Sequence, residues 1–147
     1  MKHLISVTLI ALLAGCAAQQ KSDNTIYMEA ATQFASTLPP DKKTMSFPSI
    51  KIPSHGMLAD SLAIAAGGGA NATQLRQELL NAKVSGITGF LIIGSSSALD
   101  LAVIEGATDS QDLSGMSIFY SGGTDKKNEI RSAIEKSKAS FNYISAE

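Results

Sequence analysis

Apolar residues recur at helical spacing in five segments of the chain. In the first segment they return at every fourth position from Ile26 to Leu38, and Pro39-Pro40 ends the helix predicted over 25–38. The four later helices are predicted over 57–66, 71–85, 98–107 and 125–138. In the helix over 57–66, Leu58, Leu62 and Ala65 share one face.

Turn and cap residues mark where these helices begin. Gly67-Gly68-Gly69 separates the second helix from the third and is interpreted as a linker between them. Asn71 with Gln74 three positions later resembles a capping box, so Asn71 is predicted to cap the third helix. Asp125 is predicted to cap the last one.

Strand patterns alternate with these helices. Phe90-Leu91-Ile92-Ile93 is a continuous apolar run, typical of a strand buried on both faces near the centre of a sheet. Residues 116–120 and 140–144 predict two further strands. Apolar and polar residues also alternate over 41–53, where Pro48 and Pro53 favour an edge strand or two short pieces.

The order of these elements predicts the fold. From residue 90 onward a strand, a helix, a strand, a helix and a strand follow one another with short connections. This alternation favours parallel strands joined by right-handed crossovers. We therefore predict an α/β fold over residues 25–147, a small three-layer domain with a mostly parallel sheet and the Phe90 strand near its centre.

The first sixteen residues have a pattern of their own. Met1-Lys2-His3 is short and basic. Residues 4–14 form an apolar run that is too short to span a bilayer, which takes about 20 apolar residues. The run ends in Leu13-Ala14-Gly15-Cys16, and this sequence resembles the lipobox of bacterial lipoproteins at every position.

The resemblance to bacterial lipoproteins has several implications. Residues 1–15 would be a signal peptide, and Cys16 would become the first residue of the mature protein, carrying diacylglycerol on sulfur and a further acyl chain such as palmitate on nitrogen. Ala17 stands where Asp tends to retain enterobacterial lipoproteins in the inner membrane, so the outer membrane, facing the periplasm, is expected. Residues 16–24 are small, polar and aperiodic, which is typical of a short tether.

Composition excludes several classes of site. Cys16 is the single cysteine, so the chain has no thiol pair for a disulfide and no cysteine cluster for zinc. The formal net charge is −1 and no five like charges follow one another, so nucleic acid is not an expected partner. Aromatic residues are 5% of the chain, which predicts an aliphatic core.

Two turns rich in serine and glycine follow predicted strands. Gly94-Ser95-Ser96-Ser97-Ala98 has the context of a nucleophile elbow with Ser96 as nucleophile, but no histidine follows it to act as base. We instead expect its hydroxyls to cap the next helix. The second turn is Ser121-Gly122-Gly123-Thr124. Both turns are expected at the carboxyl edge of the sheet, where helix N-termini favour anions and ligands usually bind. The candidate ligand-binding residues are Ser95, Ser96, Ser97, Gly122, Gly123 and Thr124.

The remaining polar residues form no convincing chemical set. His55 and its acidic neighbour Asp60 are too few for a metal site, and no residue is assigned as catalytic. No cofactor is expected. The sequence therefore favours a lipid-anchored, non-catalytic accessory or structural subunit of a cell-envelope assembly, of the secretion, conjugation, pilus or export type, with protein partners. The alternative is a periplasmic ligand-binding or hydrolytic domain that uses the turns at 94–98 and 121–125.

Overall fold

The sheet is the centre of the protein. The computed structural model describes residues 19–42 and 44–147, so the predicted signal peptide, the lipobox and Cys16 lie outside the described residues. The strands are β1 (Ser49–Lys51), β2 (Gly89–Ile93), β3 (Ser117–Ser121) and β4 (Ser140–Ile144). They lie side by side in chain order and every neighbouring pair is parallel. This confirms the predicted fold class, with β2 inside the sheet and the short β1 at its edge.

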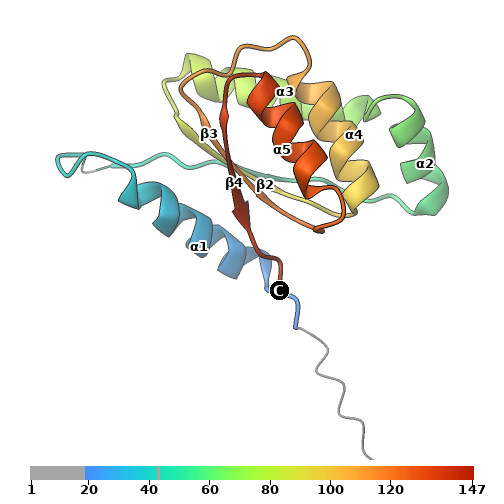
Figure 1. Ribbon diagram of the computed structural model, residues 1–147, viewed down its shortest axis with the longest axis horizontal. Coiled ribbons are helices and arrows are strands. Elements are labelled where there is room, and N and C mark those ends of the chain that lie inside the picture. Colours follow the sequence, from blue (N-terminus) through green and yellow to red (C-terminus); the bar gives the residue numbers. More distant parts are fainter. Residues whose placement is uncertain (1–18, 43) are drawn as a thin grey trace, which may run out of the picture.

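Five helices in the described part of the chain cover the sheet on two faces. They are α1 (Asp23–Ser36), α2 (Met57–Ala65), α3 (Gly69–Val84), α4 (Ser97–Thr108) and α5 (Lys127–Lys136). Because the strands follow one another across the sheet in one direction, crossovers of one hand place all the intervening helices on the same face. Figure 1 shows α2 to α5 together on that face and α1 alone on the other, which gives three layers.

The two faces of the sheet have different cores. On the side of α3, α4 and α5 the core is mainly aliphatic, with Phe90 and Tyr120 from the sheet. Under α1 the core combines aliphatic residues with three aromatic rings: the Phe34 ring stacks on Phe47 at 5.2 Å between centroids, and Phe119 meets Phe47 edge-on at 5.4 Å. The prediction of an aliphatic core therefore missed the aromatic cluster under α1.

The starts of three helices differ from the prediction. α1 begins at Asp23, inside the segment predicted as tether, because the Ser22 side chain accepts a hydrogen bond from the Thr25 N–H at 3.2 Å. Asn71 does not cap α3, which begins after Gly68. Gly68 has a φ of 89°, and a Cβ there would overlap the backbone of α4, so close packing fixes this turn. Asp125 does not cap α5, whose N-cap residue is Lys126.

The helix α2 turns its apolar stripe to solvent. Leu58, Leu62 and Ala65 share a face as predicted, but all three are exposed, and no residue of α2 is buried. Only Ala63 packs against the core of the α3 side. Within residues 19–42 and 44–147, no helix combines the length and the apolar character that crossing a bilayer requires.

Candidate functional site

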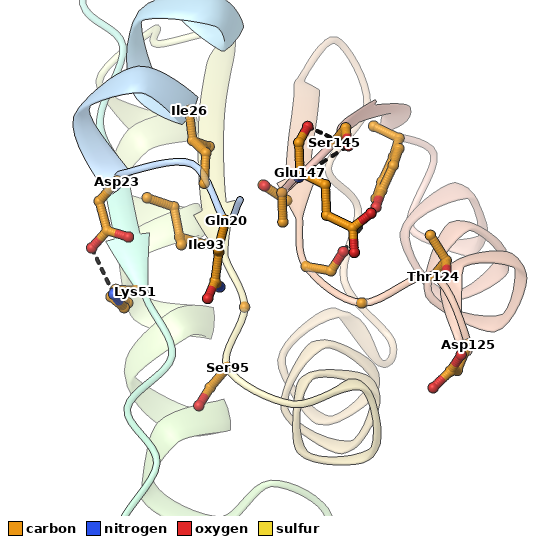
Figure 2. Close-up of a pocket in the computed structure, with 16 residues that line it drawn as sticks. Gln20, Asp23, Ile26, Lys51, Ile93, Ser95, Thr124, Asp125, Ser145 and Glu147 are labelled. Atoms are coloured by element: carbon orange, nitrogen blue, oxygen red, sulfur yellow. Dashed lines mark hydrogen bonds and ion pairs between the residues drawn. The ribbon is translucent and has the colours of Figure 1, made fainter. Parts of the chain in front are cut away.

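A crevice of about 510 Å³ opens at the carboxyl edge of the sheet. Its walls come from the start of α1, from Lys51 of β1, from the turns after β2 and β3, and from the segment after β4. Figure 2 shows Asp23 and Lys51 on one wall and Thr124 and Asp125 on the other. Of the candidate ligand-binding residues, Ser95, Gly122, Gly123 and Thr124 line this crevice, whereas Ser96 and Ser97 do not.

A buried carboxylate joins the two turns beneath the crevice. Asp100 lies in the first turn of α4 and is 0% exposed. One of its oxygens accepts a hydrogen bond from the Tyr120 hydroxyl at 2.7 Å, and the other accepts from the Ser95 N–H at 2.8 Å. Asp100 therefore links the turn after β2 to the strand that leads into the turn after β3.

This carboxylate replaces the serine cap that the sequence predicted. Ser96 is the N-cap residue of α4, but its side chain makes no capping hydrogen bond. Asp100 accepts instead from the Ser95 N–H, the kind of group that a bound anion would take at a helix N-terminus. The turn after β2 thus already donates to an internal negative charge, which argues against an external anion there.

Burial shifts the protonation of both members of the pair. Loss of solvent raises the pKa of Asp100, and the hydrogen bonds from Ser95 and Tyr120 offset part of that rise. Burial also raises the pKa of Tyr120 far above its usual value, and the nearby Asp100 charge adds to the rise. Tyr120 is therefore a permanent hydrogen-bond donor, and Asp100 is the member of the pair that can titrate.

The glycines of both turns are required by this pair. A Cβ on Gly94 would overlap the Asp100 carboxylate, and a Cβ on Gly122 would overlap the Tyr120 hydroxyl. Gly123 is confined in the same way by Ser97. The requirement here is for space rather than for an unusual backbone angle, since none of the three has a positive φ. The backbone can approach the buried pair only where side chains are absent.

Ser121 is the unusual polar group of the crevice. It is the last residue of β3, in register with Ile93 on one side and Ile144 on the other. It is 1% exposed, yet its hydroxyl has no hydrogen-bond partner among the described residues. Buried hydroxyls are nearly always bonded to protein or to ordered water, so this one calls for a further polar partner, either a water or a bound molecule.

The charges around the crevice are mostly negative. Asp23, Asp125 and Glu147 contribute carboxylates, and Lys51 is the single cation in the lining. Lys51 is already paired with Asp23 at 2.6 Å. A neutral or cationic polar ligand suits this lining better than the anion that helix N-termini alone would favour.

The histidine and the serine that the hydrolase alternative would use do not line the crevice. His55 is exposed in the loop before α2, its backbone N–H donates to Asp60 at 2.9 Å, and it is not part of the lining. Ser96 has a φ of −140°, an ordinary extended conformation rather than the strained one of a nucleophile elbow. Over 19–42 and 44–147, no three metal-binding side chains are grouped to hold an ion.

The sequence missed Asp100 and Ser121. Asp100 could have been found, because it falls on the buried stripe that continues through Val103, Ile104 and Ala107 of α4. A carboxylate on an apolar stripe in the first turn of a helix is a sign of an internal partner.

No protein-family model, curated protein or solved structure matches this chain.

Proposed function

We propose that this protein is a lipid-anchored envelope protein whose α/β domain acts as a non-catalytic accessory subunit of a larger assembly. The lipobox Leu13-Ala14-Gly15-Cys16 supports the anchor. The observation that carries the proposal further is the position of the segment just before α1. It lies beside the C-terminal segment, at the carboxyl edge of the sheet (Figure 1).

Lys21 fixes the chain at this place. Its backbone N–H donates to the Ala146 carbonyl at 2.8 Å, and its ammonium group donates to the Ser145 carbonyl at 3.3 Å and to Glu29 at 3.0 Å. Cys16 is five residues earlier, so even a fully extended chain spans at most about 18 Å between the two. A lipid on Cys16 would therefore hold the domain close to the membrane, with the carboxyl edge toward it.

A short tether of this kind suits a stationary subunit. Two or three acyl chains make the anchor effectively permanent, since each buried CH₂ contributes about 0.8 kcal/mol. The hydroxyls and carboxylates that line the crevice would supply a polar binding surface on the edge proposed to face the membrane. The outer membrane is the proposed location, because Ala17 rather than Asp follows the cysteine.

Acylation and assembly can be tested together in a Gram-negative host. We expect the full chain to incorporate radiolabelled palmitate, to fractionate with the outer membrane and to purify with a multi-protein complex. The variant Cys16→Ser should lose the label and the membrane fraction. An unlabelled wild-type chain would refute the anchor, and a labelled chain that purifies only as a free monomer would refute the accessory role.

Binding of a small polar ligand is a second candidate function, favoured by the unpartnered hydroxyl of Ser121. Such a ligand would be neutral or cationic, given the carboxylates of Asp125 and Glu147. A thermal-shift comparison of amines and neutral sugars with inorganic phosphate tests this. Stabilisation by an amine or a sugar that disappears in Ser121→Ala would support the site. Stabilisation by phosphate alone would contradict the charge argument.

A further inference from the structure

The helix α2 exposes more large apolar side chains than any other element in the described part of the chain. Met57 is 88% exposed, Leu58 78% and Leu62 65%, and Ile64 is exposed as well. The other exposed large apolar residues, Met28, Met45 and Val84, occur singly on separate segments. A contiguous apolar patch of this kind on a small domain marks a surface that something else covers.

The stripe is held in a fixed orientation. The Asp60 carboxylate, one turn into α2, accepts hydrogen bonds from the His55 backbone N–H at 2.9 Å and from the Ser54 hydroxyl. Ala63, on the side of α2 opposite the exposed stripe, packs against the core. Asp60 is the only charged residue of α2, and its carboxylate is bonded to the loop before the helix, so none of the three stripe residues Met57, Leu58 and Leu62 is charged.

The stripe begins at the same edge of the sheet as α1. β1 runs toward the carboxyl edge and ends at Lys51, which is paired with Asp23 at the start of α1. The loop over 52–56 then leads directly into α2. Figure 1 shows α2 at the outer side of α4, on the face of the sheet opposite α1. Exposure is greatest at Met57, the end of α2 nearest this edge.

We propose that the apolar stripe of α2, formed by Met57, Leu58 and Leu62, docks on the lipid surface that holds the anchor. The inference rests on the proposed acylation of Cys16, and it adds a second point of membrane contact on the other side of the sheet. The short segment between Cys16 and Lys21 keeps the carboxyl edge at the bilayer. A stripe that would bind a membrane weakly from solution then meets it at a high effective concentration.

A single added thiol can report whether lipid covers the stripe. Acylation converts the Cys16 sulfur to a thioether, so Leu58→Cys in the acylated full chain provides the only free thiol. The matched control is Val84→Cys, which is equally apolar and 89% exposed. It ends α3, shortly before β2 starts, and so lies at the opposite, amino edge of the sheet. Both variants are labelled with an environment-sensitive dye in vesicles of phosphatidylethanolamine with a minority of phosphatidylglycerol.

We expect nitroxide-labelled lipids to quench the dye at position 58 severalfold more than the dye at position 84. Equal quenching at both positions would overturn the proposal. Protection of position 58 from aqueous quenchers without quenching by lipid would also overturn it, because a second copy or another protein would then cover the stripe. If Cys16 is not acylated, thiol titration would find two free thiols per chain and mass spectrometry would find no acyl group on Cys16. These results would identify a failure of the anchor independently of the quenching.

Discussion

Replacing Tyr120 with Phe tests whether the buried pair with Asp100 is ionised and whether it stabilises the edge of the sheet. The change removes one hydroxyl and leaves the ring in place, so it creates almost no cavity. It also leaves one oxygen of a carboxylate that is 0% exposed without its donor. Hydrogen bonds to charged groups contribute about 1.5–3 kcal/mol, so we expect a loss of about 2 kcal/mol near neutral pH.

The dependence on pH gives the prediction its sign. Because the pKa of Asp100 is raised in the folded state, the folded protein holds this proton more tightly than the unfolded chain does. The contribution of Asp100 to stability is therefore full below the ordinary carboxyl pKa of about 3.9 and declines as the pH rises through the folded-state value. The hydrogen bond from Tyr120 lowers the pKa of Asp100, so Tyr120→Phe should raise that pKa further. The free energy of unfolding of the variant should therefore fall more steeply than that of the wild type as the pH rises.

Urea denaturation near pH 4 and near pH 7 measures both effects. The matched control is Tyr143→Phe, which loses a hydroxyl bonded at 2.8 Å to the neutral carbonyl of Gly122. That bond contributes about 1 kcal/mol and should leave the pH dependence unchanged. If both variants lose the same stability with the same pH slope, Asp100 is not an ionised partner of Tyr120, and the reasoning is refuted.

Three further changes probe other parts of the fold. Gly94→Ala should cost about 1–3 kcal/mol in urea denaturation, because its Cβ would overlap the Asp100 carboxylate. Phe34→Ala should cost about 3–5 kcal/mol, since it removes a buried ring that packs against both Phe47 and Phe119; a loss no larger than that of a surface change would contradict the packing. Asp112→Asn should weaken the loss of stability in acid, because Lys138, Ser114 and Lys83 hold the pKa of Asp112 below its usual value and that stability disappears as the pH falls through the folded-state value. An unchanged acid limb of the stability profile would show that Asp112 does not contribute.

The pattern of apolar residues predicted an element well where the residues of that element alone determine its secondary structure. The run from Phe90 to Ile93 predicted a strand buried on both faces, and all of β2 is buried. The spacing from Ile26 to Phe34 placed the start of α1 within two residues of its true position. Periodicity shows which residues share a face but not which way the face points. The stripe of α2 therefore turned out to be exposed, because only the small Ala63 side fits against the core.

The candidate site was predicted in outline only. Parallel strands bring the turns after β2 and β3 to one edge, so Ser95, Gly122, Gly123 and Thr124 could be placed at the same edge from the parallel arrangement alone. The bond between Asp100 and Tyr120 could not be predicted, because it depends on the register of β2 against β3 and on which face each residue takes. The predictions of the helix N-caps at Asn71 and Asp125 were wrong for a related reason. Contacts from other elements fix where a helix begins, as the backbone of α4 does at Gly68.

The position of α1 has a mechanical consequence. It is the first helix of the described chain and the one described helix on its face of the sheet, where Ile26, Ala30 and Phe34 are buried. A pull on the N-terminal end would act first on the hydrogen bond between Lys21 and Ala146 and then on α1, before any load reached α3, α4 or α5. Peeling α1 away would uncover Phe47 and Phe119 while the opposite core stayed intact. The layer formed by α1 is thus joined in series with the end of the chain that leads to Cys16.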